Sequence, residues 1–252
     1  PLCARVEEKT GGQCLLFSGA IGGLMSPDTD VENFYETARI GTAVADAALA
    51  LKTSPGGRGL SYRFEKARVP VENSRYLLFL SALTAGHTLH TADGKPLAAW
   101  RAWPLSLRHL LLGLSAKDRP WIETEVSVLD VGPMRLLGMP AEVFPELAIG
   151  GYDGKYTFGR PLVAPGGPER DLPMAPKGPY LRDMIRAPVP MIVGLANDMV
   201  GYLVPEYDFK VRPSKSMLPR YPGHYEETNS VGPSATAILT EAAARLLKEP
   251  RP

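Results

Sequence analysis

Small and polar residues follow a short apolar run late in the chain, an order typical of binding sites in α/β proteins. Residues 191–193 are apolar, and we expect them to form a buried strand. Gly194 and the pair Asn197–Asp198 break this run, and Tyr202 follows a glycine shortly afterwards. Open α/β sheets place their sites just past the carboxyl ends of strands. Tyr202 is therefore a candidate site residue, although a core strand that runs into a turn would give the same pattern.

A carboxylate holds a comparable position earlier in the chain. Residues 121–131 alternate in the manner of a strand, Gly132–Pro133 predicts a turn, and residues 134–138 predict a returning strand. Pro140 suits the first turn of a helix, which would place Glu142 in that turn, at the exit of the strand. A carboxylate there commonly stabilises a helix N-terminus. The same position would also let Glu142 reach a metal ion above the sheet edge.

A glycine-rich loop near the start of the chain could carry a nucleophile. Residues 13–18 predict a buried strand that enters this loop, which has glycines at 19, 22 and 23. Glycines permit positive φ angles and let backbone N–H groups approach a ligand, as in an oxyanion hole. Ser26 stands at the end of the loop and is the candidate nucleophile. Alternatively, Ser26 belongs to a helix entry, because residues 28–30 are good N-cap residues.

Four segments, in this order, resemble the catalytic domain of neutral/alkaline (non-lysosomal) ceramidases. Residues 17–28 resemble the nucleophile loop of that family, and residues 139–142 resemble its Pro-Gly-Glu segment. Residues 194–202 resemble the segment that ends in Gly-Tyr, and residues 224–230 resemble the later segment that contains Tyr-Glu. Each segment alone is a weak signal, but their order along the chain strengthens the resemblance.

The resemblance implies roles for four residues of this chain. Zinc would be held by Glu142 and Tyr202, together with two histidines that lie upstream of the nucleophile loop in such proteins. Ser26 or a zinc-bound water would be the nucleophile, and Tyr225 would orient the substrate or donate a proton. The reaction would be hydrolysis of the N-acyl amide bond of a lipid-like substrate. The resemblance also suggests a secreted or periplasmic protein.

Two other classes of function stay open. The first is a non-catalytic relative that kept the fold and lost the site, which is favoured by Leu24, where the family usually has Asp or Asn. The second is a metal-independent serine hydrolase with His224 as its base. No G-x-S-x-G motif surrounds Ser26, Ser81 or Ser106, so we rank the serine hydrolase last.

The elements that must position these residues predict an α/β fold: a mixed sheet with helices packed on its faces and the site at one sheet edge. Asp30–Lys52 is predicted to be a helix with a small-residue face suited to packing on a sheet, and Leu60–Val71 alternates like a strand. A last helix is expected from Pro233 to about residue 247. Because the chain begins at Pro1, we expect residues 1–252 to be the C-terminal part of a single catalytic domain.

The segments between these elements predict turns, loops and one further apolar stretch. Residues 87–95 predict a hairpin, in which His87 and His90 would point to opposite faces and make poor co-ligands. Residues 100–114 are rich in large apolar side chains, with a break expected at Trp103–Pro104 and a packed or surface role for His109. Residues 150–177 form a Pro/Gly-rich loop that could be a lid over the site or an ordinary insertion.

Composition bears on the binding partners of the protein and on its location. The formal net charge is +1, so no overall basic field points to nucleic acid or to an anionic membrane. No apolar run reaches the roughly 18 residues of a membrane span, because Arg108 interrupts the best candidate. Cys3 and Cys14 could pair, but two cysteines do not identify a compartment.

Overall fold

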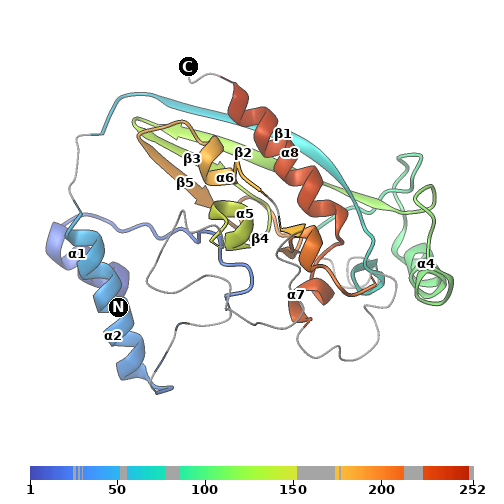
Figure 1. Cartoon of the computed structure of the whole chain (residues 1–252), viewed down its shortest axis with the longest axis horizontal. Coiled ribbons are helices and arrows are strands. Elements are labelled where there is room, and N and C mark those ends of the chain that lie inside the picture. The colour runs from blue at the N-terminus through green and yellow to red at the C-terminus, as the bar shows by residue number, and fades with distance from the viewer. Residues whose placement is uncertain are drawn as a thin grey trace.

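The fold was analysed in a computed structural model of the chain. The structure describes residues 1–24, 27, 29, 31–51, 56–77, 86–151, 174–175, 177–212 and 224–249. It is an α/β fold in which a twisted sheet lies beneath a long C-terminal helix (Figure 1). Most of the predicted Pro/Gly-rich loop at 150–177 lies outside the described residues.

The main sheet has four strands in the order β1-β2-β3-β5. Strands β1 (Leu60–Pro70) and β2 (Trp121–Val131) are antiparallel, as are β2 and β3 (Met134–Gly138). Strand β5 (Val189–Val193) lies parallel to β3 at the edge of the sheet. The predicted mixed sheet is therefore confirmed. Residues 191–193 are half-buried, not buried as predicted, because β5 is an edge strand.

Helix α8 (Ser234–Lys248) covers one face of the sheet over β1 and β2, as Figure 1 shows. Its buried side chains recur at spacings of three and four and are mostly Ala and Leu, which lets the helix approach the strands closely. The predicted C-terminal helix is thus confirmed. The buried residues of this helix are Ala235, Thr236, Leu239, Ala242, Ala243, Leu246 and Leu247.

Helices α1 (Leu2–Thr10) and α2 (Phe34–Leu49) pack against each other. Asn33 caps α2, because its Oδ1 accepts a hydrogen bond from the Glu36 backbone N–H at 2.9 Å. The helix itself was predicted, but its expected packing on the sheet was wrong. The small face of α2 meets α1 instead: a Cβ placed on Gly41 would lie 2.9 Å from Pro1 Cβ. Cys3 and Cys14 nearby are free thiols.

The strand predicted at residues 13–18 is absent. The segment is extended, and Leu15 and Leu16 are exposed. It reaches the sheet only near its end, where the Gly194 N–H donates to the Ser18 carbonyl oxygen at 2.9 Å. Pro190 in β5 has no N–H with which to extend a ladder along this edge. The apolar pattern predicts a strand, but β5 does not present the regular row of backbone N–H groups with which such a strand would pair.

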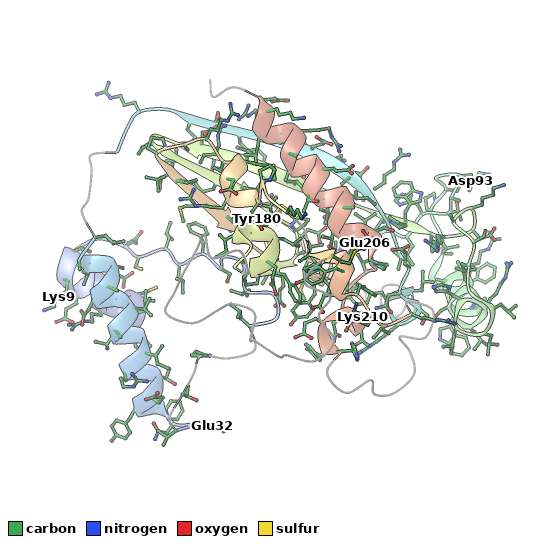
Figure 2. All side chains as sticks on the ribbon, viewed as in Figure 1. Lys9, Glu32, Asp93, Tyr180, Glu206 and Lys210 are labelled. Carbon is green, nitrogen blue, oxygen red and sulfur yellow. The ribbon has the colours of Figure 1, made fainter. Side chains whose placement is uncertain are left out.

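Helix α4 (Ala99–Leu112) lies at the end of the molecule opposite α1 and α2. In Figure 2, the labelled Asp93 marks the α4 end, whereas Lys9 and Glu32 mark the other. The predicted turn before α4 is confirmed, since Gly94 has φ +86° and its N–H donates to the Thr91 carbonyl oxygen at 2.8 Å. The predicted break at Pro104 is wrong, because α4 continues through it.

The remaining elements are short. They are β4 (Glu142–Val143), α5 (Pro145–Ile149), α6 (Leu181–Met184), β6 (Tyr202–Leu203), η2 (Glu206–Asp208) and α7 (Tyr225–Thr228). Among the described residues, no helix is both long and apolar enough to cross a bilayer.

Candidate active site

Glu142 and Tyr202 lie opposite each other on a second, two-stranded parallel sheet. The chain leaves β3 and β5 side by side, and the two segments pair again as β4 and β6, with Glu142 in register with Tyr202. The Glu142 N–H donates to the Gly201 carbonyl oxygen at 3.0 Å. The prediction that both residues leave neighbouring strands at one sheet edge is confirmed. The predicted helical turn at Glu142 is wrong, because the helix begins at Pro145 instead.

A tight turn between β5 and β6 brings β6 into register with β4. Leu195 and Asn197 have φ angles of 54° and 66°, a left-handed conformation that is uncommon outside glycine. Asn197 Nδ2 donates to Ser127 Oγ at 3.1 Å and to Glu125 Oε1 at 3.0 Å, which ties the turn to β2. The Leu195 N–H donates to the Ala141 carbonyl oxygen at 3.0 Å, so the turn also holds the segment that carries Glu142.

Gly201 is required immediately before Tyr202. Its φ is +84°, and a Cβ there would clash with the Asn229 carbonyl oxygen and the Tyr76 hydroxyl. The Tyr202 N–H donates to the same Asn229 carbonyl oxygen at 3.1 Å. The absence of a side chain at residue 201 thus lets the chain after α7 pack directly against the strand that presents Tyr202.

The side chains of Glu142 and Tyr202 lie close enough that each shifts the pKa of the other. Burial raises the pKa of the Glu142 carboxyl above its usual value; the nearby Tyr202 hydroxyl opposes this shift and the charge of Glu226 adds to it. Burial and the Glu142 charge raise the pKa of Tyr202 to about 12. Tyr202 is therefore a phenol at neutral pH.

Tyr225 completes a cluster of oxygen donors around this pair. Its ring meets the Tyr202 ring edge to face, with centroids 5.9 Å apart, and its side chain is 54% exposed. Tyr76 closes the inner side: its hydroxyl donates to the Asn229 carbonyl oxygen at 2.7 Å, and burial raises its pKa to about 12. Tyr76 was not predicted as a site residue, because it begins an apolar segment of the kind that forms protein cores.

The glycine-rich loop lies directly on β4. The Gly22 N–H donates to the Val143 carbonyl oxygen at 2.8 Å, and a Cβ at Gly22 would lie 2.8 Å from the Glu142 carbonyl oxygen. Gly23 has φ +75° and packs on the Phe144 ring. The loop therefore passes the strand of Glu142 just before Ser26. Ser26 itself lies outside the described residues, so its predicted role stays a prediction.

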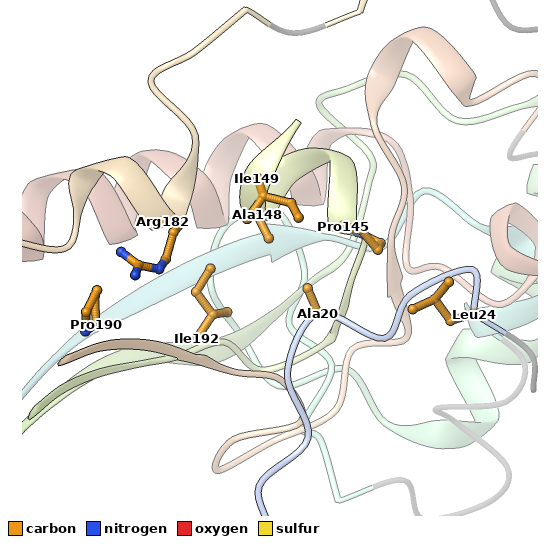
Figure 3. Close-up of a pocket in the computed structure, with 8 residues that line it drawn as sticks. All are labelled: Ala20, Leu24, Pro145, Ala148, Ile149, Arg182, Pro190 and Ile192. Atoms are coloured by element: carbon orange, nitrogen blue, oxygen red, sulfur yellow. The ribbon is translucent and has the colours of Figure 1, made fainter. Parts of the chain in front are cut away.

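An apolar pocket of about 300 Å³ lies between this loop, the two short helices α5 and α6, and the edge strand β5 (Figure 3). Arg182 provides its charged group. The remaining lining is apolar and comes from Ala20, Leu24, Pro145, Ala148, Ile149, Pro190 and Ile192. Because α5 follows β4 after a single residue, the pocket is next to the strand that carries Glu142.

Histidines of the described chain serve other contacts. His224 Nδ1 lies 2.5 Å from Glu227 Oε2, and the buried Glu227 also accepts the Val211 backbone N–H at 3.0 Å. This pair fixes α7, and with it Tyr225, to the preceding segment. His87 Nε2 lies 3.0 Å from Asp198 Oδ1. Among the residues that the structure describes, no three His, Cys, Asp or Glu side chains could together hold a metal ion.

Comparison with known proteins gives little further information. No protein-family model and no curated protein matches the chain. One similar solved structure is that of the neutral ceramidase from Pseudomonas aeruginosa, with a TM-score of 0.45 and 16% sequence identity. The match covers 98% of this chain and 39% of that one, so the chain spans about two fifths of the length of that protein. Similarity at this level carries no argument about activity.

Proposed function

We propose that the chain is part of a zinc-dependent hydrolase of the neutral ceramidase type, which cleaves the N-acyl amide bond of a lipid-like substrate. The observation that carries this proposal is the pairing of Glu142 with Tyr202 in register on adjacent strands, with the Tyr225 ring against the Tyr202 ring. The four segments that resemble the ceramidase family support the same reading.

The two side chains suit a zinc site in chemical terms. Carboxylate and other oxygen ligands bond zinc at roughly 2.0–2.2 Å, so side chains from residues paired on adjacent strands can share one ion. Burial raises the pKa of Tyr202 most, but the negative charges of Glu142 and Glu226 add to the shift, and these charges would favour a cation in the cluster. A catalytic zinc site has about three protein ligands, so we expect the two histidines outside residues 1–252 to complete it.

Each of these residues would then have its own role in the reaction. When bound, zinc would polarise the amide carbonyl or lower the pKa of a hydroxyl nucleophile. Ser26 Oγ or a water would attack the carbonyl carbon, and the backbone N–H groups of the glycine loop would stabilise the oxyanion. Tyr225 would orient the substrate or donate a proton to the leaving amine. The apolar pocket beside α5 would receive the acyl chain.

The test uses the intact protein that contains residues 1–252. Zinc content is measured by mass spectrometry, and hydrolysis is followed with a fluorescent N-acyl amide. We expect Glu142→Gln and Tyr202→Phe to lose both zinc and activity, whereas Tyr225→Phe and Ser26→Ala lose activity and keep zinc. The matched control is Tyr35→Phe, which removes a hydroxyl from an exposed side chain on α2 and should keep both properties.

Three outcomes would contradict the proposal. Activity that survives chelation but is lost in Ser26→Ala would identify a metal-independent serine hydrolase. Zinc bound without hydrolysis of any N-acyl amide would favour a non-catalytic relative. Residues 1–252 alone supply two proposed ligands, so stoichiometric zinc retained by this segment after dialysis against a weak chelator would show that the ligand set is wrong.

A further inference from the structure

Helix α4 buries its small and polar side and exposes its apolar side. The buried residues Ala102, Ser106 and His109 follow one another at spacings of four and three and face the rest of the protein. The side chains on the opposite face are large and apolar. A surface helix usually has the reverse arrangement, with its apolar stripe toward the core.

Specific hydrogen bonds fix α4 in this orientation. Ser106 Oγ donates to the Ser74 carbonyl oxygen at 2.7 Å, and His109 Nε2 contacts the Glu72 carbonyl oxygen. Both side chains are almost completely buried, at 1% and 4% exposure. Rotating the helix to bury its apolar face would break both bonds and leave polar groups without partners. The exposure of the apolar face is therefore built into the fold.

The apolar face of α4 is contiguous along the helix. Trp100, Trp103, Leu107 and Leu111 recur at spacings of three and four, so they lie in one stripe, and Leu112 extends it. Their exposure runs from 45% for Leu107 to 82% for Leu112. Large exposed patches of this kind mark interaction surfaces in soluble proteins.

The charge of α4 is positive. The helix carries Arg101 and Arg108 and no acidic residue. The Arg101 guanidinium stacks over the Trp100 ring at 4.8 Å, so cation and aromatic ring occupy the same part of the surface. Two acids lie nearby, and each faces a cation: Asp93 lies 2.9 Å from Lys95, and Asp118 lies 4.0 Å from Arg108, which leaves Arg101 and Lys117 in excess. Although the whole chain carries only +1, this end has a local excess of cations beside an apolar stripe.

We propose that the exposed face of α4 docks the protein on a bilayer that contains anionic phospholipid. Tryptophan and leucine insert at the boundary of headgroups and acyl chains, while arginines at the edge of the stripe contact lipid phosphates. Helices that lie at membrane interfaces combine these residue types. The position of α4 at one end of the molecule lets this face meet a flat surface (Figure 1). The proposal does not depend on the proposed hydrolase activity.

The test is vesicle binding by the full chain. Co-sedimentation is measured with phosphatidylcholine vesicles that contain or lack phosphatidylglycerol. Two of the three tryptophans lie on α4, so the emission of the protein should shift to the blue on binding. We expect binding to require phosphatidylglycerol and to weaken as salt is added, and the double variant Trp100→Ser, Trp103→Ser to lower affinity at least about tenfold.

Matched variants distinguish docking through α4 from nonspecific adsorption to vesicles. Phe34 and Tyr35 on α2 are at least as exposed, so Phe34→Ser, Tyr35→Ser should leave vesicle binding unchanged. Arg101→Glu, Arg108→Glu should abolish the preference for phosphatidylglycerol. The proposal would be overturned if the α4 tryptophan variant bound vesicles as tightly as the α2 variant. It would also be overturned if the wild-type protein bound neither kind of vesicle. A wild-type oligomer that the α4 tryptophan variant converts to monomers in the absence of lipid would overturn it as well, because the face would then join proteins.

Discussion

Helices α8 and α4 have 15 and 14 residues and both carry an apolar stripe, yet only α8 turns its stripe toward the protein. On α8 the stripe is made of Ala and Leu and lies on β1 and β2. On α4 the buried side is anchored by Ser106 and His109 instead. A periodic apolar pattern thus predicts that a helix forms, but the partners of its polar side chains determine which face is covered.

The largest expected difference between the two helices comes from leucine truncation. Leu239 on α8 is completely buried, so Leu239→Ala should lower the free energy of unfolding by about 2–5 kcal/mol. Leu111 on α4 is 66% exposed, and Leu111→Ala should change it by less than about 0.5 kcal/mol. Urea unfolding measures both. Similar losses would show that the α4 stripe is covered in solution.

A smaller effect is expected from the polar anchor of α4. Ser106→Ala removes the donor to the Ser74 carbonyl oxygen and should cost about 0.5–1.5 kcal/mol of unfolding free energy. Ser234→Ala, at the start of α8, is the matched control because its side chain is only half-buried. If Ser106→Ala were as stable as the wild type, the bond would not hold α4 in its orientation.

The second anchor of α4 should respond to pH. Burial lowers the pKa of His109 below its ordinary value of 6.5, so the unfolded chain binds this proton more readily than the folded one. Its contribution to stability is present above about pH 6.5 and is lost as the pH falls toward the lower folded pKa. Wild type should therefore lose stability on acidification more steeply than His109→Gln, as measured by urea unfolding between about pH 5 and 8.

His87 is a control of opposite sign for this pH experiment. Its close contact with the Asp198 carboxylate raises its pKa, so its stabilising contribution is present below about pH 6.5 and is lost as the pH rises through the folded pKa. His87→Gln should accordingly reduce stability most at the acid end. Parallel pH profiles for the two variants would contradict both assignments.

The smallest effect is expected at an exposed ion pair on α8. Arg245 Nη2 lies 2.6 Å from Glu65 Oε1 on β1, but the arginine side chain is more than half exposed. Surface ion pairs of this type are screened by salt and by water. Arg245→Gln should leave the melting temperature unchanged at physiological salt, as measured by circular dichroism. A clear loss would mean that charge, and not apolar burial, holds α8 on the sheet.

Much of the fold could be predicted where periodicity was strong. Strands β1, β2 and β3 and helices α2 and α8 follow patterns that local sequence determines. The predictions were wrong where a tertiary contact, and not the local sequence, determines the structure of a segment. Residues 13–18 have a strand pattern but no complete ladder to join, and α2 packs on α1 because Gly41 fits there. Pro104 lies on the exposed face of α4, where a missing N–H does not end the helix.

The candidate site could be predicted in its positions but not in its local geometry. Glu142 and Tyr202 were placed at one sheet edge from the strands before them, and the structure brings them together. The short parallel pair β4–β6 could not be foreseen, because two-residue strands leave no periodic signal. Tyr76 was missed for a related reason: its hydroxyl bonds a carbonyl more than 150 residues away in the chain.

The detour at residues 194–201 has a consequence for how this protein can evolve. It connects two strands that must stay in parallel register on either side of it, opposite the shorter segment 139–141. Because side chains alternate along a strand, a one-residue deletion that the turn did not absorb would place Leu203 opposite Glu142 and turn Tyr202 away. Selection can therefore vary the composition of this connection, within the limits set by its left-handed residues, but a change in its length must be taken up within the turn for the tyrosine to stay in the site.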